Sequence, residues 1–175
     1  MADWNPELYA RFADERARPV HDLLARVPLT NPERIVDLGC GAGASTAPLL
    51  ARWPGADVLG IDTSPAMIAE ARAKVPGARY EIADGATWQP EAPVDLVFSN
   101  ATLQWIPDHP MLLPRLMGWL KPGGVLAVQM PDNLDEPSHA SMRAVAAEEP
   151  FAEALKDAAG ARTKLLGYEE TWDVL

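Results

Sequence analysis

Five short apolar runs, each ending in polar residues, constrain the fold of this chain more than any other feature. The runs finish at Asp37, Asp62, Asp84, Asn100 and Met130-Pro131-Asp132. Short apolar runs that alternate with helix-like segments are typical of buried parallel strands joined by right-handed crossovers. The sequence therefore predicts an α/β fold with a doubly wound, mainly parallel sheet. The polar strand ends would share one edge, where such sheets bind ligands.

The boundaries of the elements follow from the same pattern. The predicted strands are Arg34–Leu38, Asp57–Ile61, Arg79–Ala83, Val94–Ser99 and Val125–Gln129. Helices are predicted at residues 45–53, 64–74, 138–148, 151–159 and 168–175, and on a face with Leu112, Leu113, Leu116, Met117 and Leu120. We expect Pro19 to interrupt the first helical region and Lys121-Pro122-Gly123-Gly124 to form a tight turn.

The charge and cysteine content limit the classes of partner. A formal net charge of −10, from 25 acidic against 15 basic residues, disfavours binding to nucleic acid. The single Cys40 excludes an intrachain disulfide and is consistent with a reducing cytoplasm. The first residues do not resemble a signal peptide, and no apolar run is long enough to span a membrane. We therefore expect a cytoplasmic protein without nucleic-acid or membrane partners.

A glycine-rich segment, Gly39-Cys40-Gly41-Ala42-Gly43, directly follows the first predicted strand. Glycine permits positive φ and lets the backbone approach a nucleotide-like ligand closely. The spacing of Gly39, Gly41 and Ala44 also satisfies a loose dinucleotide fingerprint, with Asp62 near the position of the ribose-binding acid. The glycines alone therefore leave NAD and S-adenosylmethionine open as ligands.

Asp37 favours the second of these ligands. A carboxylate two residues before the first glycine would face a pyrophosphate at short range, which is electrostatically costly. S-adenosylmethionine carries no phosphate, and its sulfonium and ammonium groups are stabilised by a nearby anion. The alternative for Asp37 is a structural acid that accepts hydrogen bonds from loop N–H groups, and the two interpretations are nearly balanced.

The other strand ends suit the remaining parts of the same ligand. Asp62 can accept hydrogen bonds from both ribose hydroxyls, and its alternative role as a helix cap is already filled by Ser64. Asp84 could accept from the adenine amino group, with the backbone near Ala86 meeting the ring, or it could be an ordinary turn residue. A metal held by Asp37, Asp62 and Asp84 is not expected, because separate strand ends keep them apart.

Asn100 and Trp105 come where the reacting methyl group would point. The side chain or carbonyl of Asn100 could meet the ammonium group of the methionine part. Trp105 either closes the pocket or packs in the core, and both remain open.

These residues resemble a known family over roughly residues 30–130. The matching motifs are Val36-Asp37-Leu38-Gly39-Cys40-Gly41-Ala42-Gly43, Asp62, Asp84, Ser99-Asn100 and Leu120-Lys121-Pro122-Gly123-Gly124, which together are similar to class I S-adenosylmethionine-dependent methyltransferases. The resemblance implies S-adenosyl-L-methionine as cofactor and a Rossmann-like sheet of order 3-2-1-4-5. The expected cofactor-binding residues are Asp37, Gly39, Gly41, Gly43, Asp62, Asp84, Ala86 and Asn100.

A narrower resemblance covers nearly the whole chain. Trp4-Asn5-Pro6, Leu103-Gln104-Trp105, Gln129-Met130-Pro131-Asp132-Asn133 and Glu136-Pro137-Ser138-His139 look like the trans-aconitate 2-methyltransferase family, which methylates one carboxylate of a small tricarboxylic acid. It implies a helical lid at residues 1–29 with Tyr9 and Phe12, a cofactor-binding core at 30–131 and a helical segment at 132–175, all in one domain.

The chain departs from that family after Gln129. Class I enzymes normally add a sixth and a seventh strand, and no strand-like run follows here. We therefore expect a sheet without the last two strands. Its fifth strand would be an exposed edge at which self-association is possible.

The implied reaction needs no catalytic base. A carboxylate is already ionised near neutral pH, so alignment of nucleophile, methyl carbon and sulfur would supply most of the catalysis, with Asn100 and Trp105 near the methyl group. The candidate substrate-binding residues are Arg16, Arg18, Trp105 and His109. The two arginines are candidates because guanidinium groups match carboxylates, and their alternative is a solvent-facing position on a helix. The alternative for His109 is a solvated or structural residue. The alternatives are a methyltransferase for another small molecule and an inactive S-adenosylmethionine-binding or partner-binding module.

Overall fold

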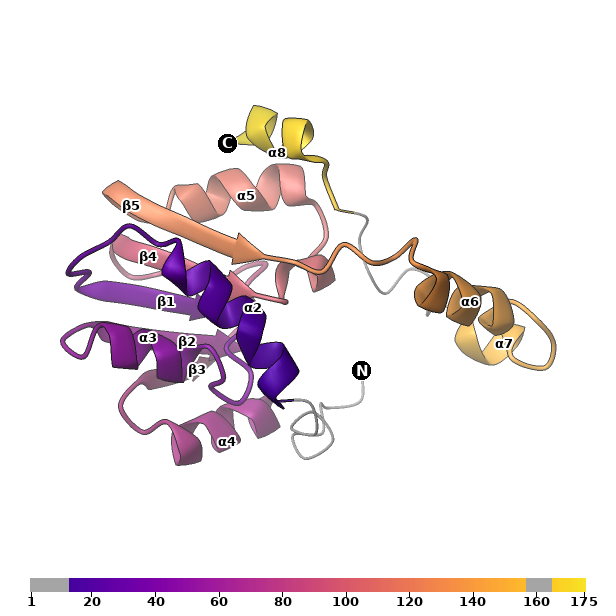
Figure 1. The fold of residues 1–175 in the computed structure, drawn as a ribbon, viewed down its shortest axis with the longest axis horizontal. Coiled ribbons are helices and arrows are strands. Elements are labelled where there is room, and N and C mark those ends of the chain that lie inside the picture. The colour runs from indigo at the N-terminus through magenta and orange to yellow at the C-terminus, as the bar shows by residue number, and fades with distance from the viewer. Residues whose placement is uncertain (1–12, 157–164) are drawn as a thin grey trace.

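Five parallel strands form one sheet in the order β3-β2-β1-β4-β5 (Figure 1). The computed structural model describes residues 13–156 and 165–175. The strands are β1 (Arg34–Leu38), β2 (Asp57–Asp62), β3 (Arg79–Ile82), β4 (Val94–Asn100) and β5 (Leu120–Gln129). Every neighbouring pair is parallel, so the predicted fold class and strand order are confirmed.

Helices cover both faces of this sheet. On one face lie α2 (Ala13–Ala25), α3 (Thr46–Arg52) and α4 (Pro65–Lys74), and on the other lie the short helix η2 (Leu103–Trp105) and α5 (His109–Met117) (Figure 1). Helix α8 (Tyr168–Val174) packs against α5. Side chains such as Leu24 and Leu49 pack on the first face against Ile35, while Leu112 packs on the second face against Val36. The central strands β1 and β4 are therefore mostly buried, as their apolar sequences require, whereas the edge strands β3 and β5 are more exposed.

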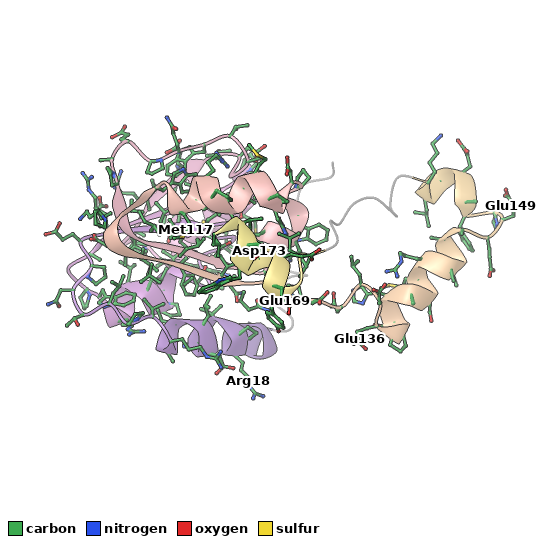
Figure 2. All side chains as sticks on the ribbon, turned by 90° about the horizontal axis from the view of Figure 1, so that it is seen from above. Arg18, Met117, Glu136, Glu149, Glu169 and Asp173 are labelled. Atoms are coloured by element: carbon green, nitrogen blue, oxygen red, sulfur yellow. The ribbon has the colours of Figure 1, made fainter. Side chains whose placement is uncertain are left out.

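The segment after β5 leaves the body of the molecule. Helices α6 (Pro137–Ala146) and α7 (Ala152–Leu155) bury none of their residues and stand apart from the sheet in both views (Figures 1 and 2). Glu136 and Glu149 mark the two ends of this arm in Figure 2. The chain then returns, and Leu166 and Val174 pack against the core on the α5 side. The predicted helical character of this segment is confirmed for the described residues.

The structure corrects three predictions about element boundaries. Pro19 does not interrupt the helix, because α2 runs through it. Leu120 belongs to β5 and not to the preceding helix. The residues predicted as a tight turn, 121–124, lie inside β5, where the pairing with β4 is irregular: Val94 is opposite Leu120, but Leu96 is opposite Val125. This irregularity accommodates the extra residues, including Gly123 with φ of 82°.

No helix within the described ranges is both long and apolar enough to cross a membrane. The strand β5 pairs with β4 alone among the described strands, so it is an edge strand, as predicted.

Candidate functional site

The site predicted from the sequence lies at the carboxyl edge of the sheet, where β1 and β4 run side by side. In the strand order the chain turns back between these two strands, and ligands bind at such a switch point. Two loops meet there: residues 39–43 after β1, called the glycine turn, and residues 100–105 after β4, called the β4 turn. Ser99 Oγ donates a hydrogen bond to the carbonyl oxygen of Leu38 at 2.9 Å and ties the two strand ends together.

The glycine turn adopts a backbone that only glycine tolerates well. Gly39, Gly41 and Gly43 have φ values of 75°, 53° and 90°. A Cβ atom on Gly39 would lie 2.1 Å from Thr102 Oγ1, and one on Gly43 would lie 2.9 Å from Val75 Cγ2. A Cβ on Gly41 would meet nothing within 4 Å. The turn therefore exposes backbone at Gly41 while packing tightly at its two outer glycines.

Asp62 holds the middle of this turn. Its Oδ2 accepts a hydrogen bond from the N–H of Gly41 at 3.0 Å, and its Oδ1 accepts from the N–H of Ser64 at 2.9 Å. The hydroxyl of Ser64 caps α4 by accepting from the N–H of Met67, as predicted. Asp62 is only partly buried, so it keeps some contact with solvent at this edge. The position of Asp62 is compatible with the predicted ribose contact, which stays a prediction.

Asp37 is completely buried beneath the turn. Ser45 Oγ donates to its two carboxylate oxygens at 2.9 and 2.8 Å, and Thr46 Oγ1 donates at 2.6 Å. Burial raises the pKa of Asp37 from 3.8 to about 6, although the hydroxyls of Thr46 and Ser45 act to lower it and Asp62 adds to the rise. These contacts match the structural alternative, with hydroxyl donors in place of loop N–H groups. The direct cofactor contact of Asp37 stays a prediction.

Asp84 and Ala86 form a small turn after β3. The N–H of Ala86 donates to Asp84 Oδ1 at 2.8 Å, and the carbonyl oxygen of Asp84 accepts from Thr87 and Trp88. The carboxylate is exposed at the same edge as Asp62. The adenine contact predicted for both residues is untested.

The β4 turn is strained and incompletely hydrogen-bonded. Ala101 has φ of 54°, a left-handed conformation that costs a non-glycine residue about 1–3 kcal/mol. Asn100 Oδ1 and Gln104 Oε1 are both buried without a hydrogen-bond partner, while Gln104 Nε2 donates to the carbonyl oxygen of Ala101 at 2.7 Å. Strained backbone and orphaned acceptors are typical of a site that a ligand completes. Asn100 was predicted here from its strand-end position.

Two residues of the β4 turn escaped the sequence-based prediction. Thr102 Oγ1 donates to the carbonyl oxygens of Gly39 and Asn100, each at 3.2 Å, and so joins the two turns. Gln104 is 3% exposed and carries one of the orphaned oxygens. The motif Leu103-Gln104-Trp105 includes Gln104 and could have drawn attention to it. Only the structure shows that its Oε1 has no hydrogen-bond donor.

The four predicted substrate-binding residues differ in their surroundings. Trp105 is 47% exposed, so it is not a core tryptophan. His109 is 2% exposed, and its Nε2 lies 2.8 Å from the carbonyl oxygen of Leu103, contacts that fit its structural alternative. Arg18 is exposed and paired with Asp22 at 3.7 Å, on the outer side of α2 (Figure 2). Arg16 lies in α2, but its side chain is outside the described part of the structure. The substrate roles of all four stay predictions.

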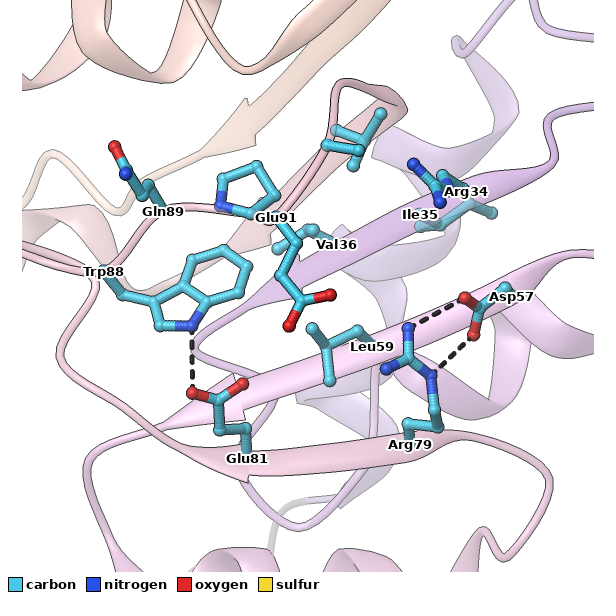
Figure 3. Close-up of a pocket in the computed structure, with 13 residues that line it drawn as sticks. Arg34, Ile35, Val36, Asp57, Leu59, Arg79, Glu81, Trp88, Gln89 and Glu91 are labelled. Atoms are coloured by element: carbon cyan, nitrogen blue, oxygen red, sulfur yellow. Dashed lines mark hydrogen bonds and ion pairs between the residues drawn. The ribbon is translucent and has the colours of Figure 1, made fainter.

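An open cavity of about 300 Å³ lies elsewhere, over the first halves of β1, β2 and β3 (Figure 3). An ion pair between Arg79 and Asp57 borders it, and Trp88 Nε1 donates to Glu81 Oε1 across it. The residues of β1 and β2 that line the cavity precede the ends of these strands, and none of the glycine turn lines it, so the cavity is not part of the glycine site. In the described ranges, no group of three metal-ligating residues lies close enough together to hold an ion.

Comparisons with known proteins agree with this geometry. A model of the methyltransferase domain family matches residues 35–124, more than half of the chain. The trans-aconitate 2-methyltransferase of Methylobacterium radiotolerans is 62% identical over 91% of this chain and 61% of its own length. The one of Methylobacterium nodulans is 60% identical over 97% of this chain and 66% of its own length. The chain thus spans less than two thirds of these two relatives.

A solved structure supports the same assignment. An S-adenosylmethionine-dependent methyltransferase from Mesorhizobium loti is 34% identical, with a TM-score of 0.61, over 70% of this chain and 57% of that one. The open space beside Gly41, the acid at Asp62 and the unpaired oxygen of Asn100 lie at the edge where such sheets bind ligands. The chain therefore belongs to the class I S-adenosylmethionine-dependent methyltransferases.

Proposed function

We propose that this chain provides the cofactor-binding half of an O-methyltransferase that acts on a carboxylate of a small polycarboxylic acid such as trans-aconitate. The observation that carries the proposal is the identity of 60–62% to relatives of that name, which extends over 91–97% of the chain. The resemblance therefore includes the β4 turn and the segment after β5, and not the glycine motif alone.

Each group of residues at the carboxyl edge would bind a different part of the cofactor. The glycine turn would bring its backbone against the cofactor, Asp62 would accept from the ribose, and Asp84 with Ala86 would meet the adenine. Asn100 Oδ1, buried without a partner, would accept from the ammonium group. Asp37 lies beneath the glycine turn and would stabilise it through the hydrogen bonds that it accepts from Ser45 and Thr46. The bound cofactor supplies an electrophilic methyl group on a positively charged sulfur.

A carboxylate acceptor explains why the site offers no evident base. Within the described residues, His109 is the histidine nearest to the β4 turn in sequence, and its Nε2 already faces the carbonyl oxygen of Leu103. A carboxylate is ionised at neutral pH and needs no proton removed. The chain would then contribute by orienting the reacting oxygen and excluding water around it. The exposed ring of Trp105 would form one wall of this space.

Cations must attract the substrate to an acidic protein. Arg18 presents an exposed guanidinium whose ion pair with Asp22 is weak at such exposure. We keep Arg16, Arg18 and the lid of residues 1–29 as the proposed substrate-capturing part, with residues 30–131 as core and 132–175 as a helical extension. Residues 1–12 lie outside the described part of the structure.

Methyl transfer from labelled cofactor tests the proposal. The purified chain is incubated with a panel of trans-aconitate, a phenol and a primary amine, and labelled products are separated. We expect transfer to trans-aconitate, with Arg18→Ala raising KM for the acid and leaving cofactor affinity unchanged. Transfer to the phenol or amine alone would overturn the carboxylate assignment. Cofactor binding without any transfer would favour a binding module.

Two further expectations belong to this proposal. A cytoplasmic location agrees with the single cysteine, and cell fractionation tests it.

Self-association through the edge strand β5 would pair its open backbone groups. Sedimentation over a dilution series should then show a dimer, and a monomer at every concentration would contradict it.

A further inference from the structure

The β4 turn holds two buried amide oxygens without donors, and both belong to the same short loop. Asn100 Oδ1 and Gln104 Oε1 lack a hydrogen-bond partner, whereas most buried polar atoms have one. Leaving such an acceptor unpaired costs free energy, so a native chain that keeps two of them in one loop requires an explanation.

Three side-chain groups in or beside the turn contact other acceptors than these two oxygens. Gln104 Nε2 donates to the carbonyl oxygen of Ala101, which orients the amide so that Oε1 points away from that partner. His109 Nε2 is 2.8 Å from the carbonyl oxygen of Leu103, and Thr102 Oγ1 is bonded to Gly39 and Asn100 carbonyls. These three groups therefore leave the two amide oxygens without a partner.

The two oxygens lie beside the ligand edge and not in the distant core. Thr102, between them in sequence, contacts the carbonyl oxygen of Gly39 in the glycine turn at 3.2 Å. Asp62 and Asp37, which are close to that turn, make the neighbourhood negative, and no Lys or Arg of the described residues pairs with either acid. Acceptors and carboxylates without a cation suit a guest that brings a positively charged N–H donor.

We propose that Gln104 is a cofactor-binding residue whose amide oxygen, together with that of Asn100, receives the ammonium group of S-adenosylmethionine. The inference rests on the proposed function and adds to it a residue and the part of the ligand it recognises. The strained Ala101 is held by Gln104 Nε2, so one side chain both braces the turn and presents an acceptor. In this structure that acceptor is buried and has no hydrogen-bond partner.

Three ligands separate this role from a structural one. S-adenosylmethionine and S-adenosylhomocysteine carry the ammonium group, whereas 5′-methylthioadenosine has the same adenosine and a sulfur but no amino-acid part. Calorimetric titration of each ligand is compared between the unchanged chain, Gln104→Leu and Gln104→Glu. Gln89→Leu, an exposed glutamine away from the glycine turn, is the matched control.

We expect Gln104→Leu to weaken binding of both ammonium-bearing ligands by about tenfold or more, since a hydrogen bond to a charged group is lost. Its affinity for 5′-methylthioadenosine should stay within about twofold of the unchanged chain. Gln104→Glu, which keeps an acceptor, should bind S-adenosylmethionine more tightly than Gln104→Leu, and Gln89→Leu should change nothing.

Equal weakening of all three ligands in Gln104→Leu would show a structural role and overturn the inference. Unchanged affinity for S-adenosylmethionine would overturn it too, because a buried water would then satisfy the oxygen. Failure of the unchanged chain to bind S-adenosylmethionine would overturn the proposed function first, and the inference with it.

Discussion

The two turns that meet at the carboxyl edge of the sheet differ in how their polar groups are satisfied. In the glycine turn, the carbonyl oxygen of Ile61 accepts from the N–H groups of Gly39 and Cys40, and Asp62 accepts from Gly41. In the β4 turn, Asn100 and Gln104 keep unpaired oxygens. The N–H groups of the glycine turn named above therefore have partners within the chain, whereas we expect the two side-chain oxygens of the β4 turn to gain partners when a ligand binds.

The largest expected effect comes from disturbing the contact between the turns. Gly39→Ala would place a Cβ 2.1 Å from Thr102 Oγ1 at a φ of 75°. We expect the unfolding free energy to fall by about 3 kcal/mol or more, and we expect cofactor binding to be lost as well. Gly41→Ala is the matched control, because its Cβ meets nothing and only the strain of about 1 kcal/mol remains. Chemical unfolding of both variants measures the difference, and equal losses would contradict the packing argument.

Asp37 should make the stability of the glycine turn depend on pH. Its pKa in the folded chain is raised to about 6 from 3.8, so the folded state holds the proton more tightly than the unfolded state. The stability from this group is complete below about pH 4 and is lost as the pH rises through 6, in total about 3 kcal/mol. The titratable groups that interact with Asp37 are Asp62, Cys40 and Tyr80. A variant at Asp37 retains all three, so a comparison with that variant isolates the contribution of Asp37.

Urea unfolding between pH 4 and 7 measures this effect as the difference in unfolding free energy between the unchanged chain and Asp37→Asn. The difference should shift in favour of the variant as the pH rises. A difference that stays constant over this range would mean that Asp37 does not titrate as a buried acid.

Asp62→Ala removes the acid that holds Gly41 and that is proposed to bind the ribose. Calorimetric affinity for S-adenosylmethionine should fall at least about tenfold, which corresponds to about 1.4 kcal/mol. Asp62→Asn, which retains one acceptor oxygen, should fall less. An affinity left unchanged in the alanine variant would remove the ribose role.

The smallest effect is expected for the link between the turns. Thr102→Val keeps the shape of the side chain but loses the hydroxyl that bonds the Gly39 and Asn100 carbonyl oxygens. We expect about 1 kcal/mol of lost stability and a few-fold weaker cofactor binding. A loss as large as that of Gly39→Ala would show that the hydroxyl, and not the close packing, joins the turns.

The sheet could be predicted because its strands are short apolar runs with polar ends. The strand order came from a family resemblance, and the structure confirms it. Pro19 misled the prediction because the apolar side chains of Val20 and Leu24 are buried against the sheet, and this packing maintains α2 through the proline. Local propensity could not reveal that packing.

The site was predictable as a set of strand ends and not as a set of contacts. Position alone predicted that Asp62 and Asn100 lie at one edge, because parallel strands bring their ends together, and the structure places both there. The partners of Asp37 come from Ser45 and Thr46, which only the path of the glycine turn brings beneath it. The unpaired oxygen of Gln104 depends on the absence of a donor in three dimensions, and a sequence pattern carries no such information.

The central claim is that the carboxyl edge accepts a positively charged, unphosphorylated nucleoside, and competition binding tests it most directly. S-adenosylmethionine and NAD are titrated separately into the chain, and each is then added to the complex of the other. We predict one S-adenosylmethionine per chain, lost in Gly39→Ala, and no displacement by NAD. Binding of NAD at the glycine turn that S-adenosylmethionine cannot reverse would contradict the account.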